Sequence, residues 1–231
     1  MSGYAVMRKG ILADFLIPLM AAAAATGAID IAGVDLAVEA LFYSPGAGWA
    51  LGGREPWAFL YRYGNIPAFA LGAMGVIAFA LSFFSERFRP DRMAALFVVV
   101  LLALGPGLLV NTVFKDHWGR PRPADVVQFG GTETYRSFWH PGSPDQGRSF
   151  PSGHAAVGFF LMAPFFVLRR KAPGWARRAL LAGILYGLTM GLGRMIQGGH
   201  FLTDVIWSGC MVYFTGLFLY YLFRLDREGL A

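Results

Sequence analysis

Six apolar runs, each close to the length of a transmembrane helix, constrain this fold more than any other feature of the sequence. They lie at residues 11–31, 65–84, 93–114, 153–168, 178–197 and 203–223, and the fourth is short and contains Pro164. A helix needs about twenty apolar residues to cross a hydrocarbon core about 30 Å thick. The runs lack the period-two alternation of barrel strands, and in lipid only helices or closed barrels satisfy the backbone. The sequence therefore predicts an all-α integral membrane bundle of six transmembrane helices.

The composition agrees with a membrane protein. Of the 231 residues, 56% are hydrophobic and only 15% are charged, which is more apolar than an ordinary soluble domain. The net charge of +6 raises the question of nucleic-acid binding. The charges lie at the ends of the apolar runs and form no basic helix or aromatic-studded groove, so we expect contact with membrane lipids and none with nucleic acid. No repeat or low-complexity linker divides the chain, which predicts a single domain over 1–231; nothing predicts its oligomeric partners.

Two local features concern redox chemistry and processing. The single cysteine, Cys210, excludes an intramolecular disulfide and a cysteine-based metal site. Arg8 and Lys9 precede an Ala-rich apolar run that resembles a signal peptide. Because that run continues to Ile31, an uncleaved anchor is favoured over cleavage.

The basic residues predict an orientation, because cytoplasmic connections are enriched in Lys and Arg. The connection after the fourth run holds five basic residues and no acidic one: Arg169, Arg170, Lys171, Arg177 and Arg178. With six crossings, both termini and the 85–92 turn lie on that same side, and each carries basic residues, among them Arg87, Arg224 and Arg227. The connections at 32–64, 115–152 and 198–202 then share the opposite side. In a bacterial inner membrane this pattern predicts cytoplasmic termini and an active site that faces the periplasm.

The 32–64 connection combines an amphipathic piece with a group of aromatic residues. The piece runs from Asp35 to Phe42, and the aromatic group contains Trp49, Trp57, Phe59, Tyr61 and Tyr63. We expect an amphipathic interfacial segment with an aromatic belt at the membrane surface. A role in gripping substrate is the alternative.

A cluster of cations follows the third run, in the stretch Lys115-Asp-His-Trp-Gly-Arg120-Pro-Arg122-Pro. Arginine offers a planar fork of donors that matches phosphate oxygens, and lysine adds a compact charge. Contact with lipid headgroups is the alternative reading of such a cluster. The cations lie, however, on the side where the orientation rule does not require them, which favours an anion site.

The second motif, Pro151-Ser152-Gly153-His154, lies where the fourth run begins. Ser152 can cap the helix, Gly153 lets an anion approach the backbone, and the free N–H groups of the first turn favour negative charge. His154 lies beside them as a candidate proton donor. An ordinary helix cap is the alternative.

The third motif contains Arg194, His200 and Asp204. The last two are four residues apart, so they lie on one helical face, and Asp204 can orient His200. The imidazole nitrogen that does not face the carboxylate is then free to act as base or nucleophile. A purely structural hydrogen bond is the alternative, but charged residues near the hydrocarbon are costly and tend to mark function. All three motifs are predicted on one side of the membrane, where they supply what a phosphoryl-transfer site needs.

Together these residues resemble the three-part signature of the type 2 phosphatidic acid phosphatase (PAP2) superfamily, written Lys-x6-Arg-Pro, Pro-Ser-Gly-His and Ser-Arg-x5-His-x3-Asp. Gly193 departs from it, since the family usually has serine there. The resemblance implies that His200 attacks phosphorus to form a phosphohistidine, that Asp204 orients it, and that His154 protonates the leaving oxygen. It implies that the phosphate is held by Lys115, Arg122, Arg194, Ser152 and Gly153. It implies no metal and no other cofactor.

The identity of the substrate is less constrained than the chemistry. The stretch Gly-Gly-His-Phe-Leu-Thr-Asp at 198–204 is similar to that of bacterial lipid A phosphatases, so a phosphorylated lipid A is the first expectation. Undecaprenyl diphosphate, phosphatidylglycerophosphate and transfer to another lipid are alternatives, and Arg120 is an additional cation that we expect to bind a second phosphate or a headgroup. A non-catalytic transporter or sensor that binds phosphate is the alternative class, disfavoured because the apolar runs carry almost no charge between their ends.

Overall fold

The computed structural model describes residues 2–226, with side chains from residue 11 onward. The described residues form helices and connections without a β-strand, and the only ladder contacts among them are two isolated bridges, Ser44 with Gly48 and Val126 with Glu133. The all-α prediction is therefore confirmed. The side chains of Arg8 and Lys9, and Arg227, on which the orientation prediction partly depends, lie outside the described residues.

Five helical segments of the described chain are long and apolar enough to cross a membrane. They are Ile11–Ile31 in α1 (Ser2–Ile31), Trp57–Leu81 in α3 (Trp57–Tyr63) and α4 (Ile66–Leu81), Arg89–His117, Pro173–Ile196 in α9, and Leu202–Leu222 in α10. The third of these combines α5 (Arg92–Leu102), the π-helix η2 (Ala103–Phe114) and α6 (Lys115–His117). Four of them coincide closely with predicted runs, whereas the second begins eight residues before the predicted run 65–84, because α3 continues it into the 32–64 connection.

The remaining predicted run, the fourth along the chain, is a shorter and interrupted helix, Gly153–Leu168. It consists of α7 (Gly153–Phe159), the 3₁₀ turn η6 (Phe160–Met162) and α8 (Ala163–Leu168). The break at Phe160–Met162 lies just before Pro164, which has no N–H to donate and whose ring clashes with the preceding turn. The count of six crossings is consistent with this arrangement, although only five segments have full spanning length.

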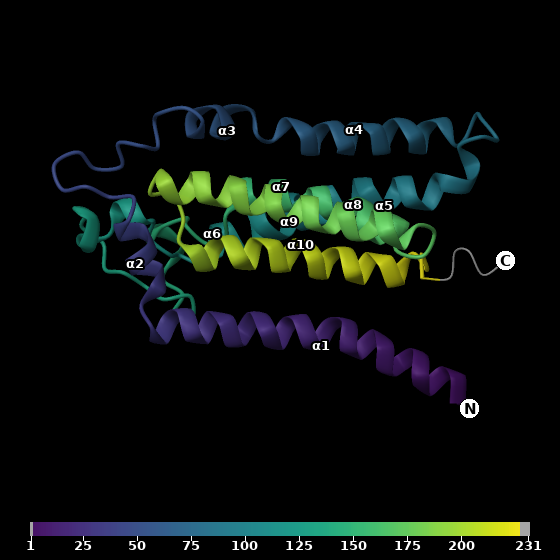
Figure 1. Ribbon diagram of the computed structural model, residues 1–231, viewed down its shortest axis with the longest axis horizontal. Helices are drawn as coiled ribbons and strands as arrows, with labels where there is room; N and C mark the ends of the chain where they lie inside the picture. The colour runs from purple at the N-terminus through teal and green to yellow at the C-terminus, as the bar shows by residue number, and fades with distance from the viewer. Residues whose placement is uncertain (1, 227–231) are drawn as a thin grey trace.

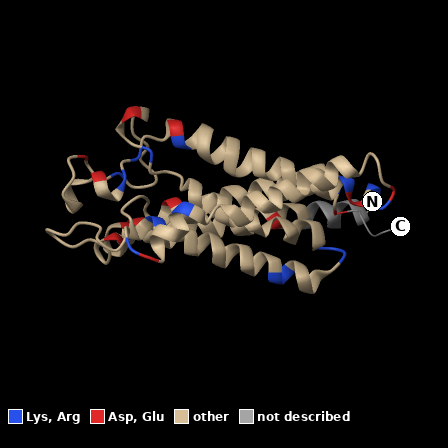
Figure 2. Cartoon of the chain, turned by 90° about the horizontal axis from the view of Figure 1, so that it is seen from above, with Lys and Arg blue, Asp and Glu red and all other residues tan. Residues whose placement is uncertain are grey.

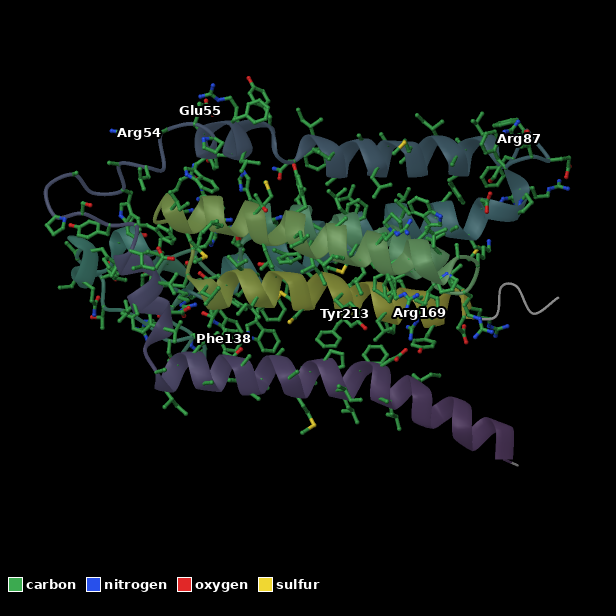
Figure 3. The ribbon with its side chains drawn as sticks, viewed as in Figure 1. Arg54, Glu55, Arg87, Phe138, Arg169 and Tyr213 are labelled. Atoms are coloured by element: carbon green, nitrogen blue, oxygen red, sulfur yellow. The ribbon has the colours of Figure 1, made fainter. Side chains whose placement is uncertain are left out.

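The helices run side by side, with both chain ends at one end of the bundle (Figure 1). The helices α2 (Val34–Ala40) and α6 and the long connections lie at the other end. Charged residues gather toward the two ends (Figure 2). Arg87 and Arg169 lie at the end that holds the termini, whereas Arg54 and Phe138 lie at the opposite end (Figure 3). The connections at 32–64, 115–152 and 198–202 thus share one end.

Glycines bring α7 and α9 into close contact in the centre of the bundle. A Cβ atom added to Gly158 would lie 3.0 Å from the Cα of Gly187, and one added to Gly187 would overlap the ring of Phe159. Such small residues allow helices to approach closely where no hydrophobic effect drives their association. The close packing fixes the N-terminal end of α7, which carries the second motif, against the C-terminal end of α9, which carries part of the third.

The polar face of α2, the amphipathic piece of the 32–64 connection, turns toward the protein. Asp35 and Glu39 are 2% and 0% exposed. The reason is a buried cation: Asp35 Oδ2 accepts a hydrogen bond from Arg120 at 2.8 Å. The aromatic residues of α3 fit the predicted belt better, since Phe59 and Tyr63 are largely exposed.

Candidate active site

His200 lies in the short turn between α9 and α10 and is almost completely buried, with 2% of its surface exposed. Its Nδ1 atom is 2.5 Å from the main-chain carbonyl oxygen of Ser149. A carbonyl oxygen can only accept a hydrogen bond, so Nδ1 carries the hydrogen and Nε2 carries the lone pair. The fold therefore fixes both the tautomer and the free nitrogen of this imidazole.

Burial also sets the charge of His200. Removal from water lowers its pKa to about 4, and the positive charges of Lys115 and Arg194 act in the same direction against the opposing effect of Asp204. Since the ordinary pKa of histidine lies near 6.5, His200 is neutral at pH 7. A neutral imidazole with a free Nε2 can act as a nucleophile.

The four-residue spacing predicts that Asp204 orients His200 directly. In the structure Asp204 lies near the ring but acts through Ser149 instead. Its Oδ2 atom is 3.8 Å from His200 Nδ1, which exceeds hydrogen-bonding distance. Oδ2 instead accepts from the hydroxyl of Ser149 at 2.5 Å and from the Phe201 N–H at 2.8 Å. Asp204 is drawn to these donors because it lies in the first turn of α10, where a carboxylate satisfies a free N–H. It thus fixes Ser149, whose carbonyl in turn orients His200.

Arg120 is fully buried and holds the carboxylate of Asp204 in place. Its guanidinium donates to Asp204 Oδ1 at 2.5 Å, Asp35 Oδ2 at 2.8 Å, Thr203 Oγ1 at 2.8 Å and the carbonyl oxygen of Arg136 at 2.9 Å. Burial alone would lower the pKa of Arg120, but the carboxylates of Asp204 and Asp35 outweigh it and raise the pKa. The prediction that Arg120 binds a second phosphate is therefore wrong, because its donors are already occupied inside the protein.

His154 lies in the first turn of α7 and is half-buried. Its imidazole stacks on the ring of Tyr61, with 4.8 Å between the ring centroids and 20° between the ring planes. Tyr61 belongs to α3, so the 32–64 connection reaches the site. The sequence predicted Tyr61 at the membrane surface, as one of several aromatic residues in this connection, and gave no signal that it meets His154.

The predicted phosphate-binding residues gather around the two histidines. Lys115 Nζ lies 3.5 Å from the carbonyl oxygen of Pro151, next to Ser152. The charges of Lys115 and Arg194 act on both His154 and His200. Arg122 is exposed at the same end, and its charge acts on Lys115 and Arg194.

Two polar atoms at this site point to an anionic ligand. The hydroxyl of Ser152 and the Nε atom of Arg194 are buried and have no hydrogen-bond partner among the residues that the structure describes. Buried donors without partners are costly and call for an explanation, which a ligand bound between these two atoms would supply. With three cations nearby, the ligand that fits is an anion with several oxygens.

Gly153 is required for a reason that the motif alone did not reveal. A Cβ atom added there would overlap the side-chain amide of Asn111 in η2. Asn111 is fixed in turn by a 2.7 Å hydrogen bond to the carbonyl oxygen of Pro106. The glycine therefore lets the second motif pack against the helix that carries the first.

Comparison with known proteins shows the family to which this chain belongs. The sequence profile of the PAP2 superfamily matches residues 94–228, which include all three motifs. The chain is 35% identical over 200 residues to the lipid A 4'-phosphatase of Francisella tularensis subsp. novicida (strain U112), covering 84% of this chain and 88% of that one. It is 38% identical over 135 residues to the lipid A 4'-phosphatase of Rhizobium leguminosarum, covering 56% of each chain. The crystal structure of a transmembrane PAP2-type phosphatidylglycerolphosphate phosphatase from Bacillus subtilis aligns with 96% of this chain and 97% of that one, at 22% identity and a TM-score of 0.48.

Proposed function

Because the chain belongs to the PAP2 superfamily, we propose that it is a multi-pass membrane phosphatase that removes the 4'-phosphate of lipid A. The observation that carries the chemistry is the neutral, buried His200 with Nε2 free, beside the positive charges of Lys115 and Arg194. The similarity to lipid A 4'-phosphatases over most of the chain supports the substrate. The burial of Arg120 favours a phosphate monoester over a diphosphate, since the expected second phosphate site is occupied by carboxylates.

In the first step, the lone pair of His200 Nε2 attacks phosphorus. The bond from phosphorus to the lipid oxygen breaks, and the leaving oxygen takes a proton from the protonated imidazole of His154. Lys115, Arg122 and Arg194 neutralise the charge on the phosphoryl oxygens, and the Ser152 hydroxyl and the Gly153 N–H donate hydrogen bonds to them. The products are the lipid alcohol and a phosphohistidine, with Asp204 and Ser149 keeping the His200 ring in place.

In the second step, water attacks the phosphohistidine. His154, now neutral, removes a proton from the water as the new oxygen–phosphorus bond forms. The phosphorus–nitrogen bond breaks, its electrons return to Nε2, and inorganic phosphate leaves. His200 and His154 are then back in their starting protonation states.

The location proposed for this reaction is the periplasmic leaflet of a bacterial inner membrane. The support is the distribution of charge: the 169–178 connection, rich in basic residues, lies at the end of the bundle that also holds both termini, opposite the site. A cytoplasmic reporter fused after Leu168 would be active under this orientation, and a periplasmic one would not.

The decisive experiment is phosphate release from lipid A by the purified protein in detergent. We expect His200→Ala to lower the rate on the order of 10⁴-fold or more, and His117→Ala, an exposed histidine at the same end of the bundle, to leave it unchanged. Release unaffected by His200→Ala would overturn the mechanism. Assays with undecaprenyl diphosphate and phosphatidylglycerophosphate test the substrate, and dephosphorylated lipid without an equal yield of free phosphate would indicate transfer to another acceptor.

A further inference from the structure

The segment at residues 49–64, which we call the covering segment, lies across the third motif. It contains α3, and Figure 3 shows Arg54 and Glu55 just before that helix, at the end of the bundle that holds the site. Glu55 Oε2 accepts a hydrogen bond from the Phe59 N–H at 2.9 Å and so caps the first turn of α3. A belt at the membrane surface was the first expectation for this segment and substrate gripping the alternative, and its position over the site agrees better with the alternative.

Specific contacts fasten the covering segment at both of its ends. Near its start, Gln197 Nε2 donates to the carbonyl oxygen of Gly52 at 3.0 Å, and a Cβ atom on Gly52 would lie 2.7 Å from the Gln197 side chain. At its end, the hydroxyl of Tyr186 donates to the carbonyl oxygen of Gly64 at 2.8 Å. The two attachments therefore hold the segment against the C-terminal half of α9.

Between these two attachments, the ring of Tyr61 contacts both sides of the phosphate site. One contact is the stack on His154 at 4.8 Å, and His154 also hydrogen-bonds the main chain of Tyr61. The other is the guanidinium of Arg194, 4.7 Å from the ring centroid. Half of the Tyr61 surface is nevertheless exposed, so the ring is not simply part of the hydrophobic core.

We propose that Tyr61 is a positioning residue that holds the imidazole of His154 and the guanidinium of Arg194 in register with each other. This proposal rests on the proposed roles of those two residues. A stacked ring restricts the rotation of the imidazole plane, so the N–H of protonated His154 stays directed at the leaving oxygen as the phosphorus–oxygen bond breaks. The same ring holds Arg194 by a cation–π contact, so the guanidinium stays on the phosphoryl oxygens.

The test uses two substrates that differ in their need for a proton. Lipid A has a sugar alcohol as leaving group, which must be protonated, whereas p-nitrophenyl phosphate releases a stable anion that needs no acid. The variants are Tyr61→Ala, Tyr61→Phe, which keeps the ring, and His154→Ala as reference. Tyr63→Ala is the matched control, because Tyr63 is on the same helix, is 44% exposed against 50% for Tyr61, and stacks only on Phe59 among the described aromatic rings.

We expect Tyr61→Ala to lower the single-turnover rate of lipid A dephosphorylation by about tenfold or more, while the burst rate of p-nitrophenol release, which reports the same first step, changes much less, as for His154→Ala. Loss of the contact with Arg194 should raise KM for both substrates to a similar extent. Tyr61→Phe and Tyr63→Ala should keep wild-type values for both. A general loss of structure in Tyr61→Ala would instead lower both rates equally, and this outcome would count against a positioning role.

Two outcomes overturn the proposal, and they differ in what they mean for the proposed function. If His154→Ala slows the reaction of lipid A much more than that of p-nitrophenyl phosphate but Tyr61→Ala does not, Tyr61 does not position the acid, and the phosphatase mechanism stands. If neither variant shows this difference while His200→Ala is inactive, His154 is not the acid, and both that role and the role of Tyr61 fail. The proposal is supported if Tyr61→Ala and His154→Ala both slow lipid A much more than p-nitrophenyl phosphate, and if Tyr61→Phe keeps the wild-type values.

Discussion

His200 and His154 lie at the same end of the bundle but in opposite kinds of surroundings. His200 is buried and is held by the carbonyl of Ser149, behind which Asp204, Arg120 and Asp35 form a chain of buried ion pairs. His154 is half-buried and is held by an exposed tyrosine, Tyr61, through a ring contact and a main-chain hydrogen bond.

The contrast fits the different tasks proposed for the two histidines. A nucleophilic imidazole has to be neutral, and its free nitrogen has to point at phosphorus. Burial keeps the ring neutral, and a fixed hydrogen bond sets its orientation. An acid that later becomes a base has to exchange protons with the leaving oxygen and with water, which a fully buried group cannot do. Rigid charge pairs therefore support one residue and an accessible stacking contact supports the other.

Of the tests that bear on this contrast beyond loss of the nucleophile itself, replacement of His154, the histidine that exchanges protons, should have the largest effect. We expect His154→Ala to lower phosphate release from lipid A by about 10²–10⁴-fold, the usual contribution of general acid–base catalysis. With p-nitrophenyl phosphate, which needs no acid in the first step, the His154 variant should accumulate phosphohistidine because no base activates the water.

Labelled phosphate on protein quenched in alkali measures this intermediate. The double variant His154→Ala/His200→Ala is the control and should carry no label. Equal labelling of the wild type and of His154→Ala would contradict the division of labour between the two histidines.

The two arginines of the first motif provide the next test. They are only two residues apart, but Arg120 belongs to the buried ion pairs behind His200, whereas Arg122 is exposed. Arg120→Met leaves Asp35 and Asp204 buried without their cation, which should lower the free energy of unfolding by about 3–5 kcal/mol. Arg122→Met removes an exposed charge, and we expect an unchanged melting temperature with a raised KM. Thermal unfolding in detergent, followed by kinetics at a permissive temperature, separates the two. Similar stability of both variants would show that the buried network does not support the nucleophile.

Much of this site followed from residue spacing, because the motifs lie at helix ends and apolar length determines where helices end. The helical segments lie close to the predicted runs, and the three connections meet at one end as the basic residues indicated. The roles of Arg120 and Arg122 were harder to separate. Both are arginines before a proline, and the contacts that bury Arg120 come from distant residues, Asp35 and Asp204, which are 85 and 84 residues away along the chain.

Other contacts left no periodic signal in the sequence. Ser149 holds His200 through its main chain, and a main-chain acceptor has no sequence signature. Tyr61 is one of several aromatic residues in a connection whose orientation depends on how Gly52 and Gly64 pack against α9. Tertiary packing, rather than local pattern, decides which aromatic residue meets the site.

The smallest expected effect concerns Glu39, whose buried carboxyl adjoins the network behind His200. Both of its oxygens lack a hydrogen-bond partner among the described residues, and burial, with the negative charges of Asp204 and Asp35, raises its pKa to about 10 despite Arg120. An unfolded carboxyl has a pKa near 4.5, so unfolding releases this proton at any pH between the two values, and stability falls as pH rises through that window.

The apolar variant Glu39→Met removes this dependence. It should be more stable than the wild type at pH 7, by at most about 3 kcal/mol, and the difference should grow toward pH 9. Melting temperatures of both proteins across pH 5–9 measure it, with Glu86→Met, a highly exposed glutamate at the other end of the bundle, as control. Because Glu39 is neutral in the folded protein, its removal should leave phosphate release unchanged. Loss of activity without loss of stability would mean that Glu39 is ionised and belongs to the charge network that orients the nucleophile.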